Sequence, residues 1–145
     1  MPRLLCVDAG EERSGLAICD EEGRLAVPLA IIERRGRALD EVAAEIAALA
    51  RAEACAGIIV GLPRNIDGTE GAQALRARGL GRRLAAASAL PLEYWDERMS
   101  SFIAESRAAA AAAPGRKRRP RHMDDLAAAV ILQTYLDARR TAERE

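Results

Sequence analysis

The segment that most constrains the fold is an apolar run, residues 3–8, that ends in a carboxylate. It reads Arg-Leu-Leu-Cys-Val-Asp. Continuous apolar runs of this length are typical of a strand that is covered on both faces. Gly10 and Gly15 follow Asp8 closely and allow the backbone to approach a ligand. The segment predicts a buried central strand with a functional carboxylate at its end, although a single aspartate in this place is more often a turn or cap residue.

The size and composition of the chain suit one globular unit. With 145 residues, we expect 1–145 to form a single domain around one core. Half of the residues are hydrophobic but only 3% are aromatic, so aliphatic side chains must fill this core. The cysteines lack CxxC spacing, which indicates reduced, buried thiols in a cytoplasmic protein. No apolar stretch approaches the ~18 residues of a membrane span, and we expect no membrane contact.

The pattern of apolar residues predicts an α/β fold. Three strands come first, and the acidic turn 20–23 joins the second to the third as a hairpin. Helices then alternate with strands, which is typical of parallel crossover connections. We therefore expect a mixed five-stranded sheet, with three antiparallel strands followed by parallel crossovers, flanked by helices. The predicted strands are 3–8, 14–20, 24–32, 57–63 and 91–96, and the predicted helices are 38–53, 69–87, 100–113 and 124–140.

Two further acidic clusters lie far from Asp8 in the sequence. Asp96-Glu97-Arg98 follows the fifth predicted strand, and Asp124-Asp125 begins the last predicted helix. Carboxylates that converge from separate elements bind hard cations such as Mg²⁺, and such ions activate water for phosphodiester hydrolysis. The alternatives are a solvated turn with an internal ion pair for the first cluster and a helix cap for the second.

Charge is unevenly distributed although the net charge is zero. Residues 1–70 carry 8 basic and 13 acidic side chains, a balance of −5, and residues 71–145 carry 14 and 9, a balance of +5. The run Arg116–Arg121 holds five cations and precedes Asp124. Such a local field attracts polyanions, and arginine suits phosphate contacts, although a codon bias also explains an excess of arginine. The loop 61–69 leads into the N-terminus of a predicted helix, and helix N-termini attract phosphate. The alternative is that this loop only connects the strand to the helix.

Taken together, four segments resemble the YqgF/RuvX family of small bacterial proteins. The segment from Asp8 to Asp20 matches its opening D-x-G-x-[K]-R-x-G-x-A-x-[S]-D motif, and Val60 to Thr69 matches its V-G-L-P-x-N-x-D-G-[ST] loop. Asp96 to Ser101 matches a D-E-R-[LM]-[ST]-[ST] segment. The closing helix motif matches Asp124 with Ala127, Ala128, Leu132, Gln133, Tyr135 and Leu136.

The resemblance implies an RNase H-like nuclease. It implies 5′-end processing of pre-16S rRNA, with Holliday-junction resolution as an older proposal and the small ribosomal subunit as a partner. Asp8, Glu97 (with Asp96 beside it) and Asp124 would be the catalytic and metal-binding residues, holding Mg²⁺ or Mn²⁺. The residues expected to bind the nucleic acid are Gly10, Arg13, Asn65, Asp67, Arg98, Arg116, Arg118 and Arg119.

Two residues depart from the family pattern. Glu12 stands where the family usually has a cation and should repel substrate unless it faces away, and His122 replaces the usual Lys or Arg. The zero net charge and the missing cation at position 12 allow an alternative, a ribosome-assembly factor that binds structured RNA without cutting it. A resolvase acting on branched DNA is a further alternative. A sugar kinase or ATPase of the actin-like class shares the D-x-G loop but needs two lobes. The sequence leaves a monomer and a homodimer both open.

Overall fold

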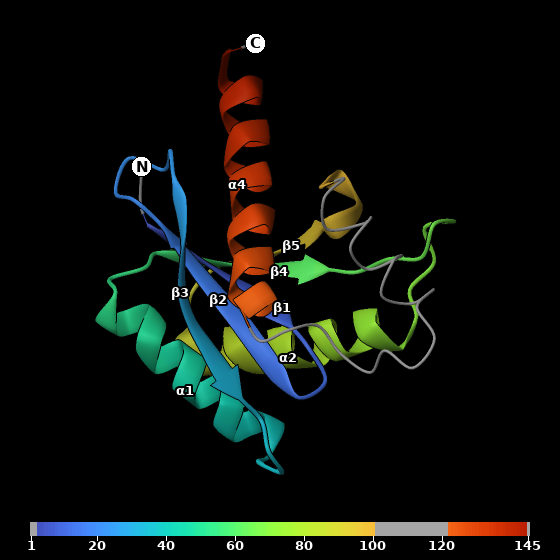
Figure 1. Ribbon diagram of the computed structural model, residues 1–145. Helices are drawn as coiled ribbons and strands as arrows, with labels where there is room; N and C mark the ends of the chain where they lie inside the picture. Colours follow the sequence, from blue (N-terminus) through green and yellow to red (C-terminus); the bar gives the residue numbers. More distant parts are fainter. Residues whose placement is uncertain (1–2, 101–121, 145) are drawn as a thin grey trace.

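A computed structural model describes residues 3–100 and 122–144 (Figure 1). The mixed five-stranded sheet expected from the sequence is confirmed, with the strand order β3-β2-β1-β4-β5. The strands are β1 (Leu4–Ala9), β2 (Arg13–Cys19), β3 (Ala26–Glu33), β4 (Gly57–Leu62) and β5 (Leu92–Asp96). The helices are α1 (Leu39–Ala52), α2 (Ala72–Ser88), the 3₁₀ turn η1 (Glu97–Met99) and α4 (His122–Arg144).

Strand pairing brings three strand ends together. β1 pairs antiparallel with β2 and parallel with β4, and β4 pairs parallel with β5. The C-terminal ends of β1, β4 and β5 therefore lie at one edge of the sheet, which we call the carboxyl edge (residues 8–10, 61–63 and 96–97). In open sheets with parallel strands, ligands bind at this edge.

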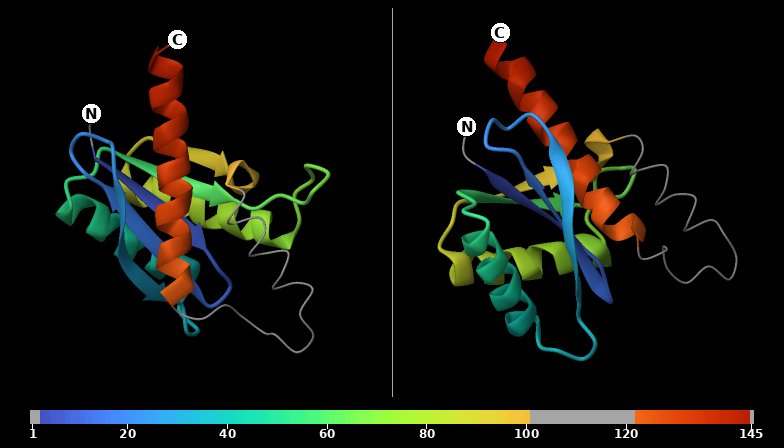
Figure 2. Two further views of the ribbon diagram at one scale, coloured as in Figure 1. Left: turned by 45° about the horizontal axis from the view of Figure 1, so that its top comes forward. Right: turned by 60° about the vertical axis from the view of Figure 1, so that its left-hand side comes forward.

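Helices cover both faces of the sheet, as Figures 1 and 2 show. Leu5 and Val7 of β1 belong to one core, formed with α1 and α2, and Cys6 belongs to a second core, formed with α4. Side chains alternate between the faces of a strand, so a central strand with helices on both sides must be apolar throughout. All six residues of β1 are buried, which confirms the prediction made from the apolar run.

The hairpin predicted at 20–23 is also confirmed. Asp20 Oδ1 accepts hydrogen bonds from the backbone N–H groups of Arg24 (2.7 Å) and Leu25 (3.2 Å), and Gly23 adopts φ +70°. Gln133 of α4 forms two hydrogen bonds with this hairpin. Its Oε1 accepts from Ala26 N (2.9 Å) and its Nε2 donates to Arg24 O (2.9 Å). The C-terminal half of α4 therefore lies at the hairpin end of the sheet, and its N-terminus lies toward the carboxyl edge.

Some predicted boundaries differ from those observed. Helix α2 begins at Ala72 rather than at residue 69, because Thr69 N and Oγ1 both donate to Asp67 Oδ1 and hold residue 69 in the loop. Helix α4 begins at His122, two residues earlier than predicted. The predicted helix 100–113 and basic loop 114–121 lie almost wholly outside the described residues. Within the described ranges, no helix combines the length and apolarity needed to cross a bilayer.

Candidate active site

Asp8 lies at the carboxyl edge on the face of the sheet that α4 covers. Its side chain is only 2% exposed, although it carries a carboxylate. It pairs across β2 with Gly15, and the register of β1 with β4, continued by one residue from Val7 and Val60, places Gly61 on its other side. Asp8 is thus flanked by two residues without side chains, which leaves space beside a carboxylate in a tightly packed sheet.

Glu97 occupies part of that space. It is the first residue of η1, directly after β5, and it is 3% exposed. A Cβ atom built on Gly61 would lie 3.0 Å from Glu97 Oε1 and 3.4 Å from its Cγ. The Glu97 carboxylate therefore lies over Gly61, next to the row that holds Asp8. The structure brings together two of the three carboxylates that the sequence proposed.

Asp96 takes a different role from its neighbour. The Arg98 side chain donates two hydrogen bonds to Asp96 Oδ2, from Nε (3.0 Å) and from Nη2 (2.7 Å). The backbone N–H of Arg98 also donates to Asp96 Oδ1 (2.9 Å). The hydrogen bonds from the Arg98 side chain lower the pKa of Asp96. The internal ion pair considered as an alternative for this cluster is therefore real, but it involves Asp96 and leaves Glu97 buried beside Gly61.

Cys6 lies two residues before Asp8 on the same face of β1, and both buried carboxylates lie near its thiol. Burial raises the pKa of the Cys6 thiol well above its ordinary value, and the negative charges of Asp8 and then Glu97 raise it further. Both carboxylates therefore act on the pKa of the same thiol. Two buried anionic oxygen donors close together suit a hard divalent cation, which offsets the cost of burying like charges.

Asp124 lies in the first turn of α4, and its side chain is outside the described residues. Ile131, seven residues later, has its Cδ1 3.0 Å from the Cβ position of Gly61. Seven residues are about two helical turns, or roughly 10 Å of rise. Because the helix N-terminus lies toward the carboxyl edge, its backbone brings position 124 to that edge. Among the described side chains, no group of three His, Cys, Asp or Glu residues is arranged to hold a metal.

The loop 63–71 carries Asn65 and Asp67 and lies against η1. Asn65 Nδ2 donates to Thr69 Oγ1 (2.9 Å), and the hydrogen bonds from the Thr69 hydroxyl and N–H lower the pKa of Asp67. Arg98 Nη1 donates to the carbonyl oxygen of Ile66 (3.4 Å), which ties the loop to the segment that holds Glu97. Both predicted substrate-binding residues of this loop are therefore exposed at the carboxyl edge, with their side chains engaged within the loop.

Arg13 and Gly10 lie on the turn between β1 and β2. Gly10 N donates to Arg13 O (2.9 Å), and a Cβ atom on Gly10 would stand 2.5 Å from that oxygen, so this turn requires glycine. Arg13 Nε lies 3.6 Å from Glu33 Oε2, and its side chain is 14% exposed. From the sequence, Arg13 is expected to bind phosphate. In this structure its side chain pairs with Glu33 of β3.

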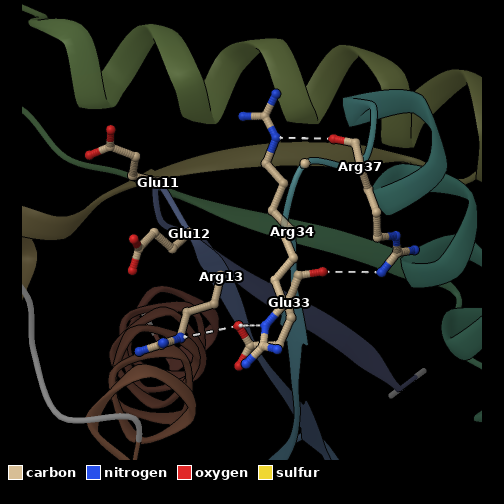
Figure 3. Close-up of a pocket in the computed structure, with 8 residues that line it drawn as sticks. Glu11, Glu12, Arg13, Glu33, Arg34 and Arg37 are labelled. Atoms are coloured by element: carbon tan, nitrogen blue, oxygen red, sulfur yellow. Dashed lines mark hydrogen bonds and ion pairs between the residues drawn. The ribbon is translucent and has the colours of Figure 1, made fainter.

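An open pocket of about 640 Å³ adjoins this turn (Figure 3). Glu12 is exposed and lines the pocket, so the side chain that departs from the family pattern does not turn into the core. Arg34 also lines it, and its Nε donates to Arg37 O (3.4 Å). The pocket mixes both signs of charge; its lining residues are Glu11, Glu12, Arg13, Glu33, Arg34, Arg35, Gly36 and Arg37.

Sequence reasoning missed two contributors to the site. Gly61 opens the space that Glu97 fills, and a glycine between apolar strand residues was a signal of close approach at that position. The sequence places Asp96 beside Glu97 and allows an ion pair within this cluster, but it does not predict that Asp96 orients Arg98. The basic residues Arg116, Arg118 and Arg119 lie outside the described residues.

Comparison with known proteins identifies relatives over nearly the whole chain. The family model RuvX, described as Holliday junction resolvase, matches residues 2–138. A protein of Anaeromyxobacter dehalogenans named "Putative pre-16S rRNA nuclease" is 49% identical over 137 residues, which cover 94% of this chain and 98% of that protein. Proteins of the same name from Symbiobacterium thermophilum (44% identical; 94% and 93% covered) and Thermosynechococcus vestitus (41%; 96% and 90%) are also similar.

Solved structures share the fold. A Thermus thermophilus RuvC in complex with a Holliday junction substrate superposes with a TM-score of 0.63 at 16% identity, covering 97% of each chain. The fowlpox virus Holliday junction resolvase superposes with a TM-score of 0.55 at 13% identity, covering 94% of this chain and 99% of that one. The expected RNase H-like architecture is therefore confirmed at the level of fold.

Proposed function

This chain belongs to the RuvX family, and from that membership we propose that it is an endonuclease that hydrolyses phosphodiester bonds of RNA with Mg²⁺ or Mn²⁺. The proposed substrate is pre-16S rRNA, which the names of the relatives contain. Within it we propose the 5′ region, bound in the cytoplasm during ribosome biogenesis. One structural observation supports the chemistry above all: Asp8 and Glu97, 2% and 3% exposed, both lie beside Gly61, Asp8 through the register of β1 with β4 and Glu97 through its side chain.

The donor set fits a hard cation. Asp8 and Glu97 offer carboxylate oxygens, and we assign Asp124 as the third ligand from its place at the start of α4. The chemistry that such a cation supplies is a lowered pKa for the attacking water and positive charge for the oxygens of the phosphate being cut. The helix dipole adds partial positive charge at the N-terminus of α4, which lies toward the same edge.

The remaining residues of the carboxyl edge would orient the strand. Arg98 is held by Asp96 with its guanidinium beside the loop 63–71, so it presents a fixed positive charge to a phosphate next to the one that is cut. Asn65 and Asp67 would contact the sugar–phosphate backbone from the loop. Arg13 would reach the same backbone from the β1–β2 turn once substrate competes with Glu33. Fixed donors orient a phosphate without having to reorganise during the reaction.

Cleavage by wild type and Asp8→Asn tests this proposal. The substrate is a fragment of pre-16S rRNA that spans the 5′ end, incubated with Mg²⁺ or Mn²⁺ and, as a control, with chelator. We expect Asp8→Asn to lose at least a hundredfold in rate, in the range known for a removed electrostatic contact. Asp40→Asn removes an exposed carboxylate on α1 and should cleave as wild type does. Equal cleavage by wild type and Asp8→Asn would refute the assignment.

The description of the family favours a second candidate, a resolvase of branched DNA. A resolvase that cuts two symmetric strands needs a two-fold dimer. Cleavage of junction DNA in preference to precursor rRNA, together with a dimeric mass in solution, would select this candidate. RNA binding that weakens steeply with salt, without metal-stimulated cleavage, would instead favour the non-cleaving assembly factor.

A further inference from the structure

The loop between β4 and α2 carries a large apolar side chain almost wholly in solvent. Ile66 is 97% exposed, more than any other large apolar residue among those the structure describes. Single exposed apolar residues are ordinary on protein surfaces. Ile66 differs from these because it stands at the tip of a loop beside the candidate active site, where a purely structural role does not call for an isoleucine.

The loop holds Ile66 outward through its own hydrogen bonds. Gly68 N donates to Asn65 O (2.9 Å), which closes a turn with Ile66 inside it, and Asn65 N donates to Thr69 O (2.9 Å). Asp67 accepts a hydrogen bond from Thr69 N (2.9 Å), and Gly68 takes a φ of +88°. The tip is therefore an ordered turn, and its apolar side chain is presented before any ligand arrives.

The same tip is tied to the candidate catalytic segment. Arg98 Nη1 donates to Ile66 O, while Arg98 Nε and Nη2 bind Asp96. Glu97 lies between Asp96 and Arg98 in the chain, so a single guanidinium links the tip of the loop to the residues on both sides of Glu97. Met99, the next residue, is 62% exposed.

Exposed apolar residues gather at this end of the molecule. Six large apolar side chains are exposed among the described residues, and two of them, Leu25 and Val27, belong to the β2–β3 hairpin at the opposite end. The other four lie on segments that border the carboxyl edge. They are Ile66 on the loop, Leu75 in the first turn of α2, Met99 in η1 and Leu126 in the first turns of α4.

The charged side chains beside Ile66 indicate which kind of ligand the exposed apolar residues contact. Arg64 precedes Ile66 by two residues and Arg98 binds its carbonyl, so the tip is flanked by two guanidinium groups, which pair with Glu70 and Asp96 respectively. Guanidinium groups suit the phosphates of a nucleic-acid strand, and apolar side chains can act as wedges between its bases. Isoleucine, leucine and methionine are among the side chains that proteins insert between stacked bases.

We infer that Ile66 inserts against a base next to the phosphate that is cut and displaces it from the stack, with Met99 supporting the unstacked base. This inference rests on the proposed function, because the strand must lie at the carboxyl edge. Asp8 and Glu97 are buried, so a regular stacked strand cannot easily bring a phosphate to them. A strand with an unstacked base bends more readily, and its phosphate can then reach both carboxylates. Ile66 is therefore a positioning residue, and it contacts base rather than the reacting atoms.

The test uses fluorescence of 2-aminopurine, which rises when the base leaves the stack. RNA stem–loops from the precursor 5′ region carry the label at successive paired positions, with the same hairpins in DNA as a second series. Binding is measured in an Asp8→Asn background so that no strand is cut. We expect a several-fold rise at one position, lost when Ile66→Ala is added. Leu25→Ala removes another exposed apolar side chain (58% exposed, against 97% for Ile66) at the hairpin end of the sheet, and it should leave the rise unchanged.

Cleavage provides the second readout. With Asp8 intact, Ile66→Ala should slow cleavage of a fully paired substrate roughly tenfold, equivalent to about 1.4 kcal/mol. A mismatch or abasic site at the labelled position should restore most of that loss, because the cost of unstacking has been removed from the substrate. Rescue of this kind would not occur if Ile66 only supported the fold.

Each outcome bears on the inference separately from the proposed function. If proteins with and without Ile66→Ala give the same rise in fluorescence and the same cleavage rate, the insertion is overturned while the nuclease assignment stays intact. A loss of rate that a mismatch does not rescue would also overturn it. If wild type cuts neither RNA nor DNA, the proposed nuclease fails, and the fluorescence of bound hairpins still decides whether Ile66 unstacks a base. Circular dichroism of each variant confirms that the fold is retained.

Discussion

Gly61 shapes the candidate site through the side chain that it lacks. The row Gly15, Asp8, Gly61, Trp95 crosses the sheet on the face under α4, and the Glu97 carboxylate occupies the space over Gly61. A methyl group there would meet Glu97 Oε1 and Ile131 Cδ1, each at 3.0 Å. Glycine in the interior of a strand weakens the strand, so its presence here marks close approach by another group.

We predict that Gly61→Ala lowers both the activity and the stability of the protein. The added methyl group must displace Glu97 or Ile131 by a few tenths of an ångström, and overpacking of this kind costs about 1–3 kcal/mol. A displaced carboxylate should lower kcat/KM roughly ten- to a hundredfold. Urea denaturation and cleavage kinetics of the same preparations measure both effects.

Gly79→Ala is the matched control. Gly79 lies inside α2, and a Cβ atom there meets only ordinary contacts, the nearest at 3.6 Å from Arg83 Nη1. Alanine in a helix interior is favoured over glycine by about 1 kcal/mol, so this variant should be more stable and equally active. Wild-type kinetics in Gly61→Ala would contradict the predicted effect of displacing Glu97.

Among the elements, η1 and the loop 63–71 form one unit through the Asp96–Arg98 pair. The side-chain hydrogen bond from Arg98 is the main cause of the lowered pKa of Asp96. A carboxyl group whose pKa is lower in the folded protein than in the unfolded chain stabilises the fold above its unfolded pKa, and this contribution is lost as the pH falls through the folded value. The contribution of this pair is therefore complete above about pH 4 and declines below it.

We predict that Asp96→Asn makes the stability of the protein less sensitive to acid. Wild type should lose stability between pH 6 and pH 3, because Asp96, Asp67 and Asp20 all have lowered pKa values. The variant should be less stable at pH 6 and should lose less on acidification. Urea midpoints at both pH values measure the difference. An equal loss in the two proteins would show that the pair contributes no pH-dependent stability.

The sequence predicted the regular elements well because their patterns are strong. The apolar run 3–8 specifies β1, and the helical spacing of Val42, Ala43 and Ile46 specifies α1. Boundaries and short segments depend on tertiary contacts. The start of α2 follows from hydrogen bonds of Thr69, and η1 is too short for any periodicity to reveal. Adjacent Asp96 and Glu97 look alike in sequence, and only the fold determines which one Arg98 binds.

At the scale of the whole molecule, the candidate site joins parts of the chain that are distant in sequence. Asp8 comes from the first strand and Glu97 from the segment after the fifth, and α4 closes over the same face. The sequence predicted this convergence because parallel strands end at a common edge. It could not predict the mixed charge of the pocket beside Arg13, which arises from the β1–β2 turn meeting the β3–α1 connection.

We predict that divalent cations stabilise wild type more than Asp8→Asn. A ligand that binds only the folded state at a hundredfold excess over its Kd adds about 2.7 kcal/mol, which is roughly 5–10 °C in Tm for a chain of this size. The Tm of Asp8→Asn should rise much less, and that of Asp40→Asn should rise as in wild type. Differential scanning calorimetry with Mn²⁺ or Mg²⁺ measures this without any substrate. Equal shifts in all three proteins would place the cation elsewhere.

The order of elements along the chain has a consequence for protein synthesis. Helix α4 covers Cys6, Ile59 and the rest of that core, yet it follows all five strands in the sequence. While a nascent chain is still attached to the translating ribosome, the face that carries Asp8 lies open to water. We expect Asp8 and Glu97 to reach their buried arrangement only after α4 has been translated.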